Sequence, residues 1–526
     1  MMKAEVQAQS NNQRTQLWVA ISALTVFALL YSLSALLAPF WNDNDTWSNL
    51  LPIIHFRHSI LDQHTLPLFT DLWYGGRSQW ANPLWSFLYL PSTILWLMTP
   101  LDWGTRIVFL GHLIFSLLAA RKLASLFLET ELERFSVAII LTSPVFPALA
   151  AGHIEKVMSW GWVLLAVFFL LNEDLTSMQR GLGSGICFGI VPLTGANYYT
   201  FYAGIILLPL AFSHKDSKLL LYFLLGAFLG LLHLPSIWYM IGNARAHAEI
   251  YIAAYSVSGP GIISALATGL ANPLSWETWT PIGLPSIYLF VIIFSSRIQQ
   301  AFLENEKAIS PQEASLLFSI IVLLLFATGI AYFGHDLFDA FRVPARALAF
   351  IALGVTFFIL VNAKGIIASG ILKQRLLSLF LFISAVQIAV SAWIIRPEGS
   401  AHSPYEVSVQ RVADILKDDQ AKNVWFSAKD LHYMYIHVGL TRNNLSLPSV
   451  YYGDMGQVIK IQGNHCGYSF DHLLAFAPVE GPAYELNAGV EWSDAHGEIP
   501  MKNLFLLGQL RLDKDTINIY RVICDK

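Results

Sequence analysis

Charged residues and cysteines are both scarce in this sequence. Only 13% of the 526 residues are charged and 55% are hydrophobic, whereas soluble domains carry about a quarter charged residues. We therefore predict a polytopic membrane protein. The three cysteines are too few for a disulfide framework. Cys466 and Cys524 can pair only if their region lies outside the cytoplasm, and two unpaired thiols fit the sequence equally well.

An excess of basic over acidic residues is also missing. The formal net charge is -4, so nucleic acid is not an expected partner. What the sequence does contain is a series of long apolar runs, and roughly 20 such residues cross the hydrocarbon core of a bilayer. We predict eleven spans, at 17–40, 103–120, 135–151, 157–172, two within 181–213 around a polar break at 195–197, 219–241, 282–296, 314–333, 347–362 and 376–395.

One further apolar segment, 84–98, is short and contains Pro91. If it does not cross, thirteen Lys and Arg residues of the loops lie on the side of the N-terminus and seven on the other. Cytoplasmic loops carry the Lys/Arg excess. We therefore predict that 84–98 is re-entrant or interfacial, that the N-terminus is cytoplasmic, and that the C-terminal region is external in a multi-pass cell membrane protein.

The composition changes near Arg396. Residues 1–395 are predicted to form the membrane domain, with 41–102 as its first external loop, and 396–526 a small external α/β domain. Helical spacing covers 407–417. Strands are expected at 423–428, 457–461 and 473–477, and a closing hairpin at 504–512 and 517–522.

Asp43 and Asp45 lie just after the first predicted span. Carboxylates two apart in an extended loop can share a divalent cation such as Mg²⁺ or Mn²⁺, or act as a ligand and a general base. A plainer reading is that Asp45 or Thr46 is the N-cap of a following helix.

His153, Glu155 and Lys156 lie where a predicted span begins on the same side. Three ionisable groups at a membrane boundary are costly unless they are solvated or paired. They can form a second acidic site, with Glu155 as a metal ligand, or contact a phosphate through His153 or Lys156. The alternative is an interfacial loop with a Glu155–Lys156 pair.

A third cluster runs from His335 to Arg346. With Pro344 in the first turn of the next helix, Arg342 and Arg346 lie at a helix N-terminus, where backbone N–H groups and guanidiniums suit a phosphate. The alternatives are pairing with nearby aspartates or contact with lipid headgroups. Tyr198, beside the break at 195–197, can stack on a sugar ring or belong to an aromatic belt.

These residues resemble the GT-C superfamily of membrane glycosyltransferases. Asp45-Thr46-Trp47-Ser48-Asn49 is similar to the acid-Trp-Asn motif of the oligosaccharyltransferase branch, with Leu50-Leu51 in place of Tyr-Arg. Three later segments also resemble motifs of this superfamily: Trp73-Tyr74-Gly75-Gly76, Leu88-Tyr89-Leu90-Pro91 and residues 151–156. The last segment has one acidic residue where the family has two. Gly152-His153 and the segment 341–346 look more like YfhO-type membrane proteins.

The resemblance implies sugar transfer from a polyprenyl-phosphate-linked donor to a lipid, glycan or protein acceptor on the external face. Asp45, helped by Asp43, would act as base, and His153, Glu155, Lys156, Tyr198, His335, Arg342 and Arg346 would bind the substrates. The alternatives are a transporter or flippase for a lipid-linked glycan, or an assembly factor that keeps the fold without the chemistry.

Overall fold

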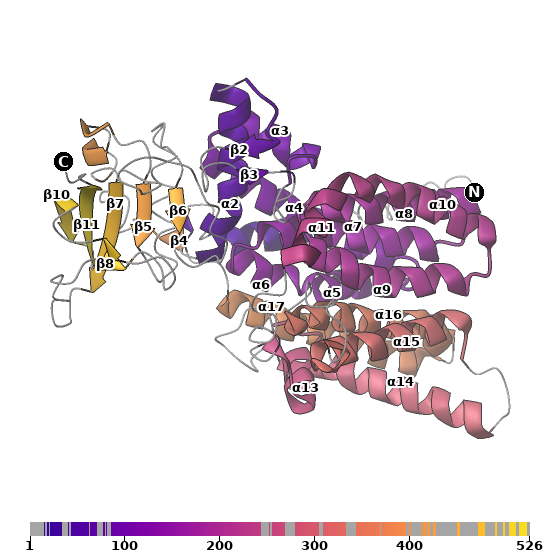
Figure 1. The fold of residues 1–526 in the computed structure, drawn as a ribbon. Coiled ribbons are helices and arrows are strands. Elements are labelled where there is room, and N and C mark those ends of the chain that lie inside the picture. Colours follow the sequence, from indigo (N-terminus) through magenta and orange to yellow (C-terminus); the bar gives the residue numbers. More distant parts are fainter. Residues whose placement is uncertain are drawn as a thin grey trace. The chain divides into compact units, whose positions relative to one another are not determined.

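Long helices make up most of the computed structural model of this chain (Figure 1). The chain divides into two units, one of Met1–Leu37 with Pro83–Glu398 and one of Ala38–Asn82 with Gly399–Lys526. The first loop therefore groups with the C-terminal segment. Some helix and strand residues, Asp45 among them, are described by their backbone alone. The structure describes residues 15, 18–19, 21–33, 40–41, 44–62, 64–70, 77–78, 80, 86–243, 252, 255–268, 279–303, 309–332, 343–368, 370–395, 399–400, 412, 414–416, 418–420, 424–427, 450–452, 472–478, 490–491, 498–499, 504–511 and 515–522.

The larger unit is an all-helical bundle. After a first apolar helix at Ile21–Leu33, its elements are α3 (Leu90–Met98), α4 (Leu101–Ala124), α5 (Glu131–Thr142), α6 (Val145–Ala150), α7 (Ile154–Leu171), α8 (Ser177–Leu193), α9 (Asn197–Ser213), α10 (Ser217–Ala227), η2 (Phe228–His233), α11 (Leu234–Asn243), α13 (Gly259–Thr268), α14 (Leu284–Leu303), α15 (Pro311–Ala327), η5 (Ile330–Tyr332), η7 (Pro344–Arg346), α16 (Ala347–Ala368) and α17 (Ile371–Ile394).

Five of the described helices are long and apolar enough to cross a membrane: Trp103–Ala124, Ile154–Leu171, Ser217–Trp238, Pro344–Ala368 and Ile371–Ile394. The predicted count of eleven spans is not confirmed. The predicted span 135–151 is divided into α5 and α6 at Ser143-Pro144, because proline cannot continue the helical hydrogen bonds. The predicted break at 195–197 is confirmed, since α8 ends before it and α9 begins within it.

The segment predicted as re-entrant forms α3, which has nine residues. At 1.5 Å per residue this helix is about 14 Å long, less than half the hydrocarbon thickness. A hydrogen-bonded chain holds its start. The Tyr89 hydroxyl lies 2.8 Å from His112 Nε2, and Trp162 Nε1 donates to the same hydroxyl at 2.9 Å. The segment is therefore fixed to α4 and α7 inside the bundle.

Glycines at four-residue spacing bring α8 against α10. A Cβ on Gly181 would lie 2.4 Å from Leu219 O, and one on Gly185 would lie 2.1 Å from Phe223 O. Small residues at this spacing allow two helix backbones to approach closely, as in membrane helix pairs. The close approach fixes α8, which runs directly into the turn that starts α9.

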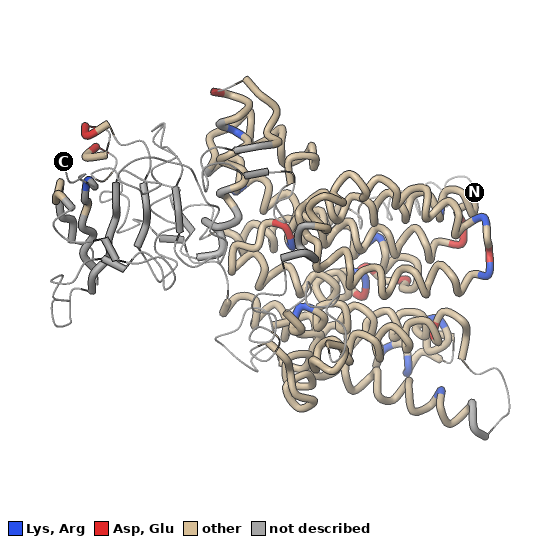
Figure 2. Tube along the Cα trace, viewed as in Figure 1, with Lys and Arg blue, Asp and Glu red and all other residues tan. Residues whose placement is uncertain are grey.

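One end of the bundle carries most of its described charged contacts. Arg180 donates to Leu170 O at the end of α7 and to the His214 ring after α9. Ser177 donates to Asp216. These bonds place the end of α7, the start of α8, the end of α9 and the start of α10 together. Figure 2 shows the charged positions of this unit mostly at helix ends.

The other unit contains α2 (Asn44–Arg57), η1 (His58–Asp62) and short strand pairs. β1 (Phe40–Trp41) pairs with β4 (Gly399–Ser400), and β2 (Phe69–Thr70) with β3 (Arg77–Ser78). A five-stranded mixed sheet has the order β10-β11-β7-β5-β6, and β8 (Val490–Glu491) pairs with β9 (Glu498–Ile499).

The sheet strands are β5 (Val424–Ser427), β6 (Val450–Tyr452), β7 (His472–Pro478), β10 (Leu504–Arg511) and β11 (Asp515–Val522). Predicted strands at 423–428 and 473–477 and the closing hairpin correspond to β5, β7 and β10–β11, and the hairpin pairs antiparallel. Helical turns are described at 412, 414–416 and 418, within and just after the predicted 407–417 helix. The predicted strand 457–461 and the pair Cys466 and Cys524 lie outside the described residues.

Candidate functional site

A hollow lies in the helical unit where α7 and α9 begin. It is partly open, and the roughly 300 Å³ of space around it includes open solvent, so the enclosed part is much smaller. The lining residues come from several parts of the fold: Pro144 just before α6, Pro147 and Ala148 of α6, His153 and Lys156 at the start of α7, Tyr199 of α9, Trp279 and Thr280 of the segment before α14, Arg346 of η7 and Ala349 of α16. Segments far apart in the sequence thus enclose one site.

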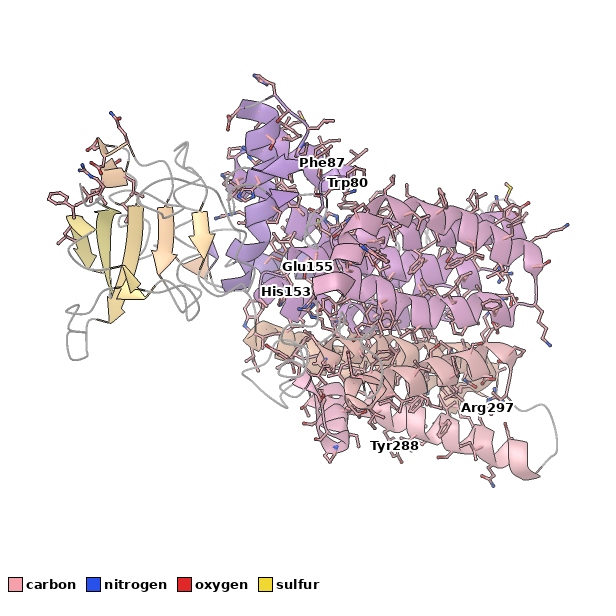
Figure 3. The ribbon with its side chains drawn as sticks, in the orientation of Figure 1. Trp80, Phe87, His153, Glu155, Tyr288 and Arg297 are labelled. Atoms are coloured by element: carbon pink, nitrogen blue, oxygen red, sulfur yellow. The ribbon has the colours of Figure 1, made fainter. Side chains whose placement is uncertain are left out.

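The start of α7 contributes ionisable side chains to the hollow and its immediate surroundings. Gly152 has a φ of +73°, a left-handed conformation that glycine adopts without strain, and it turns the chain from α6 into α7. His153, Glu155 and Lys156 follow at once and are 8%, 8% and 6% exposed. Figure 3 shows His153 and Glu155 together at one end of the helices, and Arg297 toward the other.

Burial of three ionisable groups requires partners. His153 Nδ1 lies 3.5 Å from Glu155 Oε1. The alternative drawn from the sequence paired Glu155 with Lys156, whereas the described ion pair of Glu155 is with His153. Glu155 Oε2 is buried and has no hydrogen-bond partner among the described residues. The carboxylate therefore keeps one oxygen available for a ligand.

The starts of α9 and α16 supply the remaining wall. The Cζ atom of Arg346 lies 4.2 Å from the centre of the Tyr198 ring, a cation–π distance that holds the guanidinium in place. As predicted, Pro344 occupies the first turn, that of η7, with Arg346 as its last residue. The structure thus brings together five predicted residues, namely His153, Glu155, Lys156, Tyr198 and Arg346.

An aromatic cluster beneath the hollow locks the three helices together. Trp160 of α7, Tyr199 of α9 and Phe350 of α16 make edge-on contacts, with ring centres 5.1 to 5.5 Å apart. The Trp160 indole also donates to Leu141 O at 2.7 Å. Such aromatic pairs contribute about 0.5–1.5 kcal/mol each beyond the area that they bury. These contacts hold α7, α9 and α16 together next to the lining residues of the hollow.

Sequence reasoning missed part of this lining. Trp279 and Thr280 were not singled out, and neither were Pro144 and Pro147. In Trp279-Thr280-Pro281 an aromatic and a hydroxyl residue precede a proline and a long apolar run. This is the one sequence feature that could have marked the segment as part of a site. Nothing in its spacing indicated that this segment would lie beside the start of α7.

Four predicted residues cannot be compared with this geometry. Asp45 lies in the first turn of α2, which begins at Asn44 rather than after Asp45, and its side chain is not described. Asp43, His335 and Arg342 lie outside the described residues. The roles predicted for these four residues stay predictions.

The described side chains do not by themselves make a complete metal site. They contain no group of three or more His, Cys, Asp or Glu residues that could hold an ion. Among the described residues, His153 in the lining of the hollow and Glu155 beside it are the His and carboxylate groups near the site, whereas Mg²⁺ prefers six ligand oxygens in a near-octahedral arrangement. Lys156 and Arg346 also bring positive charge to the same place. The Mg²⁺ or Mn²⁺ predicted at Asp43, Asp45 and Glu155 stays a prediction, because the side chains of the two aspartates are not described.

Comparisons with known proteins give fold likeness at low identity. No protein-family model matches this chain, and no curated protein matches it in sequence. ArnT from Cupriavidus metallidurans in the apo state has 10% identity and a TM-score of 0.48, over 97% of this chain and 98% of that one. The Archaeoglobus fulgidus oligosaccharyltransferase in complex with Zn and sulfate has 12% identity and a TM-score of 0.43, over 87% and 67%. The arabinofuranosyltransferase AftD from Mycobacteria has 13% and 0.49, over 98% of this chain but 42% of AftD.

Proposed function

We propose that this chain is a membrane glycosyltransferase that transfers a sugar from a polyprenyl-phosphate-linked donor to an acceptor on the external face of the membrane. The observation that carries the proposal is the hollow at the starts of α7 and α16, with Lys156, His153 and Arg346 in its wall. Both helices belong to segments long and apolar enough to span a membrane. A lipid phosphate lies at the depth where such helices begin.

The cations at the hollow suit the leaving group. In an inverting displacement, the acceptor oxygen bonds to the anomeric carbon while the bond from that carbon to the phosphate oxygen breaks. The bond electrons remain on the phosphate, whose charge grows. Lys156 and Arg346 would stabilise that charge, because cationic donors in a low-dielectric site act most strongly where charge develops. The guanidinium stacked on Tyr198 is already oriented for this task.

The acceptor proton needs a base. We assign this role to Asp45, with Asp43 as its helper, on the resemblance of Asp45-Thr46-Trp47 to the acid motif of the GT-C superfamily. A positioned carboxylate that takes the proton contributes on the order of 10²–10⁴ in rate. Glu155, through its unpaired Oε2, would orient the acceptor, and Arg342 and His335 would add contacts to the donor.

Substitutions at the hollow test the proposal. Membranes that contain the full-length chain are supplied with a polyprenyl-phosphate-linked sugar, and transfer to endogenous acceptors is measured. Lys156→Met should reduce the rate about 10²-fold or more, the usual effect of removing one donor to a developing anion. Lys364→Met is the matched control, because Lys364 is an exposed lysine toward the far end of α16.

Asp45→Asn should abolish transfer without reducing the amount of protein in the membrane, since the amide cannot accept the proton. Full activity of this variant would remove Asp45 from the mechanism. Full activity of Lys156→Met would show that the hollow takes no part in the reaction. A comparison of glycolipids and glycans between a deletion strain and its parent would then identify the sugar and the acceptor.

The transporter alternative predicts charged groups along a path through the bundle. Figure 2 instead shows the described charged positions of the helical unit mostly at helix ends. Three polar groups between α3, α4 and α7, those of Tyr89, His112 and Trp162, are joined by hydrogen bonds through the Tyr89 hydroxyl. The transferase reading therefore fits the described residues better.

A further inference from the structure

Two buried donors in the wall of the hollow have no hydrogen-bond partner among the residues that the structure describes. Trp279 and Thr280 are 4% and 5% exposed. Neither Trp279 Nε1 nor Thr280 Oγ1 has a hydrogen-bond partner within the described part of the chain. Buried polar groups are nearly always paired, because an unpaired one loses its bonds to water without replacement. Two consecutive exceptions that line one hollow indicate that a ligand supplies the missing acceptors.

The segment that carries these donors is held firmly. Ile282 N donates to Leu266 O at 2.8 Å, and Ile282 is fully buried. Gly283 packs so closely on α17 that a Cβ would lie 2.7 Å from that of Ser384. The Ser286 hydroxyl and backbone N–H both donate to the Ser384 hydroxyl, at 2.8 and 3.1 Å. The donors therefore cannot readily swing toward another partner, and they are preorganised for whatever enters the hollow.

The chemistry of the lining selects the ligand. Lysine, arginine and the tryptophan indole only donate hydrogen bonds, and Lys156, Arg346 and Trp279 all line the hollow. Phosphate oxygens only accept, so this donor-only part of the lining suits a phosphate, whereas a sugar hydroxyl is better served by the side of Glu155, which offers an acceptor. Pro144 and Pro147 form an apolar part of the same lining. This combination matches a phosphate joined to a hydrocarbon chain.

We propose that Trp279 Nε1 and Thr280 Oγ1 donate two neutral hydrogen bonds to the phosphate oxygens of a lipid phosphoester seated in this hollow. The proposal rests on the proposed function for the presence of such a lipid. It adds that recognition is shared between the cations, which attract the charge, and two neutral donors, which fix the direction of the phosphate.

The proposal has a signature that a structural role would lack. When a hydroxyl or indole N–H is bonded inside the protein, its removal leaves the partner unpaired and lowers stability. Thr280→Val and Trp279→Phe remove donors that have no partner among the described residues. The ligand-free variants, Thr280→Val above all because it is nearly isosteric, should therefore unfold no earlier than the wild type. Their affinity for the lipid phosphate should fall.

The experiment uses the full chain purified in detergent, with farnesyl phosphate as the probe, and measures affinity by titration and stability by thermal unfolding. Inorganic phosphate and farnesol are titrated in parallel, to separate a lipid phosphate from a free phosphate and from the chain alone. Thr93→Val is the matched control, because Thr93 is 3% exposed and its hydroxyl donates to Phe87 O, which lies before α3, at 2.8 Å.

We expect Thr280→Val and Trp279→Phe each to weaken farnesyl phosphate binding roughly 10-fold or more, the usual effect of losing a bond to a charged group. Thr93→Val should lower stability and leave affinity unchanged. Unchanged affinity in both donor variants, with binding intact in the wild type, overturns this inference and leaves the proposed function standing.

Three other outcomes are decisive. A loss of ligand-free stability in Thr280→Val as large as that in Thr93→Val shows a structural role and also overturns the inference. Inorganic phosphate that binds as tightly as farnesyl phosphate overturns the lipid source. Wild-type protein that binds neither phosphate overturns both the inference and the reading of the hollow in the proposed function.

Discussion

The close approach of α8 and α10 makes Gly185 the position where one added methyl group should do most harm. In Gly185→Ala the new Cβ would lie 2.1 Å from Phe223 O, 2.9 Å from Phe223 C and 3.0 Å from Ala227 N. All three atoms belong to backbone, so no side chain can turn aside. Ordinary contact begins near 3.4 Å, so the helices must separate by about 1 Å or bend, since overpacked cores relax through backbone shifts.

The net effect follows from two opposing terms. Overpacking of this kind costs about 1–3 kcal/mol, and the strictly backbone contact places Gly185 toward the upper part of that range. Alanine recovers up to about 1 kcal/mol through its better helix propensity. We therefore expect a net loss of about 1–2 kcal/mol. In a chain of this size the melting temperature should fall by a few degrees, since each kcal/mol shifts it by about 2–4 °C in domains of 150–250 residues.

The matched control is Gly111→Ala in α4, because a Cβ there would meet nothing within 4 Å. The same substitution should leave the melting temperature unchanged or raise it. Both variants are purified in the same detergent and unfolded by heat, with helix content checked by circular dichroism. If Gly185→Ala melts at or above both the wild type and Gly111→Ala, then α8 and α10 do not pack as described.

Two further predictions concern groups outside the hollow. Tyr89→Phe removes a hydroxyl shared by the His112 ring and the Trp162 indole, so it should lower stability by about 1–3 kcal/mol, measured by thermal unfolding. Burial and the adjacent Arg180 guanidinium lower the pKa of His214 in the folded chain. The unfolded histidine titrates near 6.5, so below that pH the unfolded chain binds the proton more readily than the folded one. Stability should therefore fall as pH drops from about 7 toward 5. His214→Gln should flatten that pH dependence, and an unaltered profile would show that His214 does not cause it.

The sequence was most informative where local chemistry decides structure. The break between α8 and α9 follows from Gly195, whose φ of +84° favours glycine. The hairpin of β10 and β11 follows from two apolar strands joined by a short polar turn. Pro344 in the first turn beside Arg346 follows from the fixed φ of proline. Each prediction needed only a few neighbouring residues.

The remainder depended on contacts between distant segments. Hydropathy suggested one span over 135–151, but the structure divides it into α5 and α6, and Pro144 and Pro147 of that region then line the hollow. Trp279 and Thr280 carry no pattern that places them beside Lys156. Their importance comes from burial without partners, which is a property of the folded chain and not of any short sequence.

The two ends of the helical unit differ in how their helices begin. At one end, side-chain oxygens of Thr130, Thr176, Asp216 and Ser310 accept bonds from the first turns of α5, α8, α10 and α15. Helix N-termini need such acceptors, and they attract negative charge. At the hollow, the residues before α7 and α9 are His153 and Ala196, and neither caps its helix with its side chain.

The capped starts are complete without a ligand, as expected of helix ends whose role is structural. The starts of α7 and α9 instead present Lys156 and Tyr199 to a hollow that also holds Arg346 and two unpaired donors. An anion bound in the hollow would supply the starts of α7 and α9 with negative charge and hydrogen-bond acceptors. At the other end of the unit, capping side chains of the protein supply the acceptors. If that is the reason for the difference, a bound lipid phosphate should slow amide exchange at the start of α7 and leave the start of α8 unchanged. Equal protection at both starts would contradict this explanation.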